Sequence, residues 1–126
     1  MQMILSVAVG GALGAAARYL VNVATTRLFG IDFPWGTVAV NVTGSFLMGA
    51  LISFMALKWS TGQEMRAFLT TGVLGGFTTL SALSLDFATL FERGQSVLAA
   101  AYVVGSVAVS LIAIFAGLSL VRLLMT

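Results

Sequence analysis

Residues 70–86 read TTGVLGGFTTLSALSLD and gather six hydroxyl side chains, three glycines and an aspartate. The chain as a whole is strongly hydrophobic, since 60% of its 126 residues are hydrophobic and 8% are charged. Soluble domains carry about 25% charged residues. Polar groups inside an apolar run need partners, because hydrocarbon offers none. This stretch therefore decides which membrane fold the chain can adopt.

Gly75 and Gly76 lie in the middle of this run and are followed by Thr78 and Thr79. Glycine costs about 1 kcal/mol relative to alanine in a helix interior, so we expect the membrane helix to break here. A break frees backbone carbonyl and amide groups, and in transport proteins such groups coordinate ions. The alternative is a close helix–helix contact at the glycine pair without unwinding.

Four apolar runs are each long enough to cross a bilayer, which takes about 20 residues. We expect spans from residue 3 to the mid-twenties and over residues 34–57, 64–91 and 96–124. The first run lacks the basic segment and cleavage site of a secretory signal, so it is interpreted as a retained span. The sequence thus predicts an all-α integral membrane protein with four transmembrane helices, a break in the third, and both ends on one side.

Composition also excludes several classes of function. The chain has no cysteine and no histidine, so it lacks thiolate metal sites and disulfides, the usual general base and the commonest metal ligand. Without a nucleophile–base pair or a metal cluster, an enzyme is not expected. The net charge of +2 indicates contact with anionic lipid headgroups and not with nucleic acid.

The positive charges are nearly balanced across the membrane. One side carries Lys58, Arg66 and Arg122, and the other carries Arg27 and Arg93 with Arg18 close by. Orientation follows the excess of Lys and Arg in the loops, and here that excess is small. The sequence therefore permits both orientations and an antiparallel, dual-topology dimer. A small bias that fixes one orientation stays open as the alternative.

Three of the expected helices each carry a line of neutral polar side chains. Spacings of three or four residues keep such side chains on one helix face. The lines are Thr37, Asn41 and Ser45; Thr78, Ser81 and Ser84; and Tyr102, Ser106 and Ser110. Hydroxyl residues also serve helix packing, but an amide such as Asn41 in a membrane faces a partner or a water-filled path. Three lines in one small chain favour a pathway.

Asp86 and Arg18 are the charges nearest the hydrocarbon. Both are interpreted as residues at the membrane interface, because Asp86 lies close to the end of its span. A role for Asp86 as a proton carrier is the less favoured reading.

These segments together resemble the Fluc fluoride channels, also called the CrcB-like family. The resemblance runs nearly end to end, through GGALGAAARY at 10–19, PWGTVAVNVTGSFLMG at 34–49, TTGVLGGFTTLSALS at 70–84 and ERG at 92–94. It implies that residues 1–126 form one four-helix transmembrane channel domain. It further implies an antiparallel homodimer in the inner (plasma) membrane, with two parallel fluoride pores built from both subunits.

The resemblance also implies the residues of the site. The ion pathway would be formed by Asn41, Leu80, Ser81, Leu83, Ser84, Tyr102, Ser106 and Ser110. Arg18 would lie at an aqueous vestibule. A structural sodium ion at the dimer centre would be held by the backbone carbonyls of Gly75 and Thr78.

The implied activity is passive export of fluoride, which lowers its toxicity in the cytoplasm. One charge crossing 100 mV gains about 2.3 kcal/mol, so no nucleotide is needed. The sequence has no GxxxxGK[ST] loop to bind one.

One segment departs from the family pattern. The motif after the glycine pair usually reads TTFSTFS, whereas residues 78–84 are TTLSALS. Leu80 and Leu83 thus replace two pore phenylalanines, and Ala82 replaces a threonine. A phenyl ring offers an electropositive edge to an anion, and leucine does not. We expect the fold and dimer to survive this change and conduction to be reduced or abolished at a hydrophobic constriction.

Two other functions are alternatives to a homodimeric channel. The chain would be a non-conducting subunit of a heterodimeric fluoride channel if a related, phenylalanine-bearing partner exists. A small proton-coupled multidrug antiporter also has four spans, but it requires a membrane-embedded carboxylate, and the first span has none.

Overall fold

The computed structural model describes residues 2–126, and the secondary structure of this range is helical. Three spans are single helices: α1 (Gln2–Phe29), α2 (Trp35–Leu57) and α6 (Ser96–Met125). The remaining span consists of α3 (Gln63–Ala67), η1 (Phe68–Leu74), α4 (Gly75–Phe77) and α5 (Leu80–Glu92). All four spans are long and apolar enough to cross a membrane. The chain is therefore a multi-pass membrane protein, and the predicted spans are confirmed to within a few residues.

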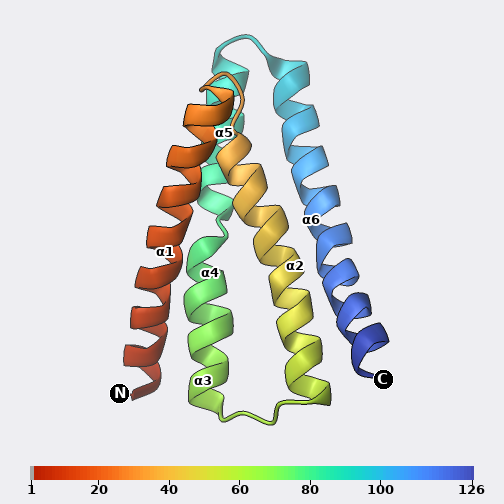
Figure 1. Ribbon diagram of the computed structural model, residues 1–126. Helices are drawn as coiled ribbons and strands as arrows, with labels where there is room; N and C mark the ends of the chain where they lie inside the picture. The colour runs from red at the N-terminus through yellow and green to blue at the C-terminus, as the bar shows by residue number, and fades with distance from the viewer. Residues whose placement is uncertain (1) are drawn as a thin grey trace.

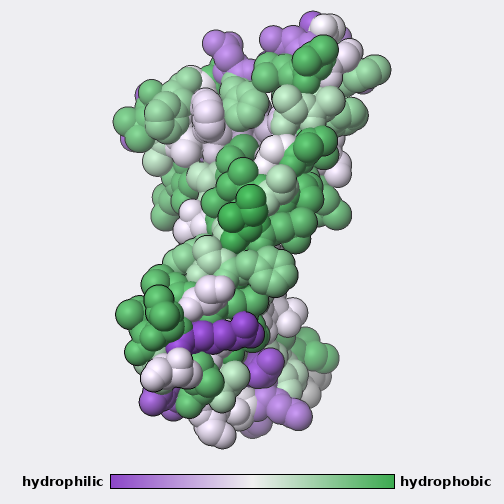
Figure 2. Space-filling model, turned by 90° about the vertical axis from the view of Figure 1, so that its right-hand side faces the viewer, coloured by the Kyte–Doolittle hydropathy of each residue, from purple (hydrophilic) through white to green (hydrophobic). Residues whose placement is uncertain are grey.

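The spans form an up-and-down bundle (Figure 1). Both ends of the chain and the α3 side of the third span lie at one end of the bundle, and the α1–α2 and α5–α6 connections lie at the other. Figure 2 shows a largely hydrophobic side, with hydrophilic residues gathered toward the two ends. This distribution fits a bundle whose middle faces lipid.

Helices α2 and α6 touch through their backbones. A methyl group added at Gly49 would lie 2.1 Å from the carbonyl oxygen of Ile114, and one added at Gly117 would lie 2.1 Å from that of Phe46. Such distances leave no room for a side chain. The two glycines thus allow the closest packing that helices can reach in a membrane.

Helix α1 packs against η1 and α4 in the same way. A methyl group at Gly14 would lie 2.1 Å from the carbonyl oxygen of Val73, and one at Gly76 would lie 2.7 Å from that of Gly11. Gly76 therefore serves close helix contact, as the alternative interpretation of the sequence proposed, whereas a methyl group at Gly75 would meet only the Thr70 carbonyl of its own span, at 3.4 Å.

The third span is broken, as predicted, but the predicted position of the break was wrong. Gly75 and Gly76 are helical within α4, and the interruption lies at Thr78 and Thr79. Thr78 has φ −85° and ψ 158°, and Thr79 has φ −155° and ψ 121°. The Thr79 hydroxyl accepts a hydrogen bond from the Ala82 N–H at 3.1 Å and so caps α5. The threonines end one helix and start the next, while Gly76 packs against Gly11 of α1.

Candidate ion pathway

A groove of about 300 Å³ lies where α2, α6 and the break meet. Its polar lining comprises Asn41, Ser45, Thr78, Thr79, Ser106 and Ser110. Leu80 and Leu83 add to the apolar lining. The groove therefore brings together six of the residues that the sequence placed in polar lines or in the break, and both leucines of the TTLSALS segment.

Two serines of α6 that line this groove have unpaired hydroxyl groups. The Oγ atoms of Ser106 and Ser110 are buried and have no hydrogen-bond partner among residues 2–126. Helical serines commonly bond back to their own helix, as Ser84 does to the Leu80 carbonyl at 3.1 Å. An unpaired buried polar group costs about 1–3 kcal/mol. Two such hydroxyls on one groove wall indicate a surface suited to a polar ligand.

Asn41 faces the break across the same groove. Its Oδ1 accepts from the Thr79 N–H at 2.7 Å, and its Nδ2 donates to the Thr79 carbonyl at 3.1 Å. The side chain of α2 thus satisfies backbone groups that the interruption frees, which hydrocarbon does not. Asn41 therefore links α2, which forms one wall of the groove, to the break in the third span.

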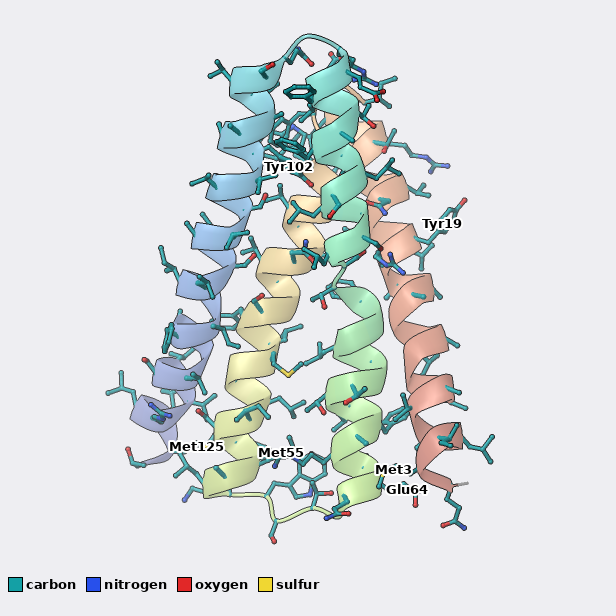
Figure 3. The ribbon with its side chains drawn as sticks, turned by 180° about the vertical axis from the view of Figure 1, so that it is seen from behind. Met3, Tyr19, Met55, Glu64, Tyr102 and Met125 are labelled. Carbon is teal, nitrogen blue, oxygen red and sulfur yellow. The ribbon has the colours of Figure 1, made fainter. Side chains whose placement is uncertain are left out.

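One helical turn beyond the groove, three polar side chains form a cluster. Both Thr37 Oγ1, at 2.7 Å, and the Tyr102 hydroxyl, at 2.9 Å, donate to Asp86 Oδ2. Thr37 and Tyr102 are buried, and Figure 3 shows Tyr102 near the end of the bundle that carries the α5–α6 loop. Tyr102 therefore lies next to the groove, bonded to Asp86, and does not line it.

The interpretation of Asp86 as an interface residue was incomplete, because its carboxylate accepts two hydrogen bonds from inside the bundle. A signal for this was present in the sequence. Asp86 falls on the same helix face as Leu83 and Leu90, which are buried, and a charge on a buried face needs partners.

A second cavity, of about 320 Å³, begins at this cluster. It is lined by Thr37 and Asp86 and extends to Asn22, Asp32 and Arg93 near the α1–α2 connection. Polar lining thus continues from the groove, past the Asp86 cluster, toward one end of the bundle.

The Asp86 cluster is expected to stabilise the fold through hydrogen bonds more than through charge. Asp86→Ala leaves two buried hydroxyls without an acceptor and should destabilise the protein by about 2–6 kcal/mol, because each unpaired group costs about 1–3 kcal/mol. Asp86→Asn keeps an oxygen that can accept both bonds and should cost less. Unfolding in a detergent titration measures both variants. Equal losses for the two would contradict this account.

The remaining predicted pathway residues lie elsewhere. Ser81 and Ser84 are exposed on α5 and do not line the groove. Ser81 shares a hydrogen bond with Thr79 through their hydroxyl oxygens, 3.2 Å apart. Arg18 is half-buried on α1, and its buried Nε has no partner among residues 2–126.

The sequence as a whole matches a known family and many of its members. Residues 5–118 match the family model described as CrcB-like protein, Camphor Resistance (CrcB). The chain is 60% identical over 119 residues to the fluoride-specific ion channel FluC of Cereibacter sphaeroides, covering 94% of each chain. It is 56% identical over 116 residues to the protein of the same name from Agrobacterium fabrum, covering 92% of this chain and 93% of the relative.

The chain belongs to the CrcB-like family.

In this CrcB-like chain the break deprives two carbonyl oxygens of their helical donors. In a continuous helix the Gly75 carbonyl would accept from the Thr79 N–H, and the Thr78 carbonyl from the Ala82 N–H. Here the Thr79 N–H donates to Asn41 Oδ1 instead, and the Ala82 N–H donates to the Thr79 hydroxyl. Carbonyl oxygens released at a helix break are the groups that bind sodium in transport proteins. The residues present therefore fit such an ion.

Proposed function

We propose that this CrcB-like chain is a passive, fluoride-selective channel of the plasma membrane that exports fluoride from the cytoplasm, and not an enzyme. The observation that carries the proposal is the groove in which the unpaired hydroxyls of Ser106 and Ser110 lie beside the Asn41 amide. Relatives that share 56–60% of its residues are named fluoride-specific ion channels.

Selectivity in this channel comes from neutral donors. Hydroxyl and amide groups replace part of the hydration shell of a small anion, and several weak sites let the ion leave again. No charged side chain is among the residues that line the groove in the described range 2–126. A neutral wall avoids the tight binding that would trap the ion.

The pore is completed by a second, antiparallel copy of the chain. Leu80 lines the groove yet is 75% exposed, so one subunit alone leaves the pathway open on the side of α5. The near balance of positive charges supports both orientations. A sodium ion at the dimer centre, bound by the Gly75 and Thr78 carbonyls of both copies, is part of this proposal.

The conduction of this chain is limited by Leu80, Ala82 and Leu83, which give the pathway a hydrophobic constriction. The second candidate function follows from the same leucines. A chain that cannot conduct alone serves as one subunit of a heterodimeric fluoride channel. The multidrug antiporter has less support, since the carboxylate of Asp86 is bonded to Thr37 and Tyr102.

Fluoride efflux from liposomes that contain the purified protein tests the function directly. A fluoride electrode records efflux after a potassium ionophore sets the membrane potential. Efflux of fluoride without efflux of chloride supports the proposal. A purified dimer that passes no fluoride, even when the constriction is relieved by mutation, contradicts the homodimeric channel.

Loss of one groove hydroxyl is expected to separate conduction from stability. Ser106→Ala, in a background that conducts, should lower efflux about ten- to a hundredfold, because one hydrogen bond to a charged ion contributes about 1.5–3 kcal/mol and each 1.36 kcal/mol is about tenfold in rate. The free energy of unfolding should stay unchanged or rise, since the hydroxyl has no partner to lose. Ser53→Ala is the matched control, because its hydroxyl does bond, to the Leu118 carbonyl at 3.1 Å. It should lower stability and leave efflux unchanged.

A further inference from the structure

The amide of Asn41 exchanges two hydrogen bonds with a single residue. Both its accepted bond (2.7 Å) and its donated bond (3.1 Å) are to the backbone of Thr79. Facing residues in antiparallel strands exchange their N–H and C=O groups in the same pairwise way. Here the side-chain amide of Asn41, on α2, takes the place of the backbone groups of a neighbouring strand and pairs with the extended residue Thr79.

The N–H of Thr79 depends on this pairing. Thr79 is the N-cap of α5, and its N–H has no backbone partner among residues 2–126, because its extended conformation takes this group out of the helical ladder. Its hydroxyl is already engaged as the cap of α5. Without Asn41 the Thr79 N–H would be unpaired in the middle of the membrane.

The pairing also fixes which way the amide points. The opposite orientation would set Nδ2 against the Thr79 N–H and Oδ1 against the carbonyl, two donors and two acceptors face to face. Nδ2 carries two hydrogens, and one is donated to Thr79. The other stays on the wall of the groove that Ser106 and Ser110 also line.

We propose that Asn41 is a positioning residue that acts through Thr79. This pair of bonds, here called the Asn41–Thr79 clamp, sets where α5 begins and thereby where Leu80 and Leu83 stand in the groove. An ion in the groove meets the second hydrogen of Nδ2 and leaves the clamp closed. The role in permeation rests on the proposed fluoride function, whereas the clamp itself does not.

Hydrogen exchange at the Thr79 amide, followed by NMR on the fluoride-free protein in detergent, tests the clamp. In Asn41→Ala the amide should exchange about tenfold faster than in the unchanged chain, the effect of losing one ordinary hydrogen bond. The matched control is Ser45→Ala, one turn along the same face of α2 and also in the groove lining. It should leave the exchange of Thr79 unchanged. Equal exchange in Asn41→Ala and the unchanged chain would overturn the proposal.

A second measurement needs no variant and guards against a mutant that fails to fold. In the unchanged protein one of the two Nδ2 hydrogens of Asn41 should lie close to Thr79 by nuclear Overhauser effect. Addition of sodium fluoride should leave the Thr79 amide protected. Loss of that protection on fluoride addition, or the absence of an Overhauser effect between Thr79 and either Nδ2 hydrogen, would overturn the clamp. Absence of fluoride efflux with the clamp intact would count against the proposed function alone.

Discussion

Fluoride efflux from liposomes is expected to be roughly ten- to a hundredfold faster after the triple change Leu80→Phe, Ala82→Thr and Leu83→Phe. Both leucines line the groove, Leu80 exposed and Leu83 buried. Contacts between pairs of aromatic rings contribute about 0.5–1.5 kcal/mol each. With the same magnitude for an anion at each ring edge, two rings lower the barrier by about 1–3 kcal/mol. Each 1.36 kcal/mol is about a tenfold change in rate.

The control for this experiment adds a ring on the same helix but outside the groove. Leu85→Phe is suitable, because Leu85 lies on α5, is exposed and does not line the groove. It should leave efflux at the level of the unchanged chain. If the unchanged chain already conducts as fast as the triple variant, the rings are dispensable and the hydroxyl and amide groups suffice. If neither conducts although both form dimers, a missing partner subunit is the better account.

The largest loss of stability is expected at the glycines where helices touch. Gly49→Ala and Gly14→Ala each place a methyl group 2.1 Å from a backbone oxygen, so the helices must separate. Overpacking of this kind typically costs about 1–3 kcal/mol and occasionally more, and here the neighbour is backbone, which cannot rotate away. Detergent-induced unfolding, followed by circular dichroism, measures the loss.

Gly105→Ala provides the contrast within the same bundle. A methyl group at Gly105 would have no atom within 4 Å, and alanine favours a helix over glycine by about 1 kcal/mol. This variant should be as stable as the unchanged chain or more so. Equal destabilisation at Gly49 and Gly105 would show that helix propensity, and not close packing, governs these positions.

The four spans were predictable because hydropathy alone sets them. Apolar runs of sufficient length must cross the membrane as helices, and the predicted boundaries agree with the observed ones within a few residues. The position of the break was less predictable. Gly75 and Gly76 weaken a helix by propensity, but both are helical within α4, where Gly76 packs against Gly11 of α1. At Gly76 tertiary packing outweighs the low helix propensity of glycine.

The site was predictable in part, for a related reason. Spacing correctly put Asn41 and Ser45 on one face and Ser106 and Ser110 on another, and both faces line the groove. Spacing within one helix does not reveal which helices meet. The bonds from Thr37 and Tyr102 to Asp86 join three helices, so no single helix face identified them.

The placement of both chain ends at one end of the bundle (Figure 1) also governs how the protein can be labelled. A tag fused to either end reports the same face of the membrane, so the two ends are interchangeable as reporters of orientation. In an antiparallel pair, an impermeant reagent applied to one face would reach half of the tags. In a population with one orientation it would reach all of them or none.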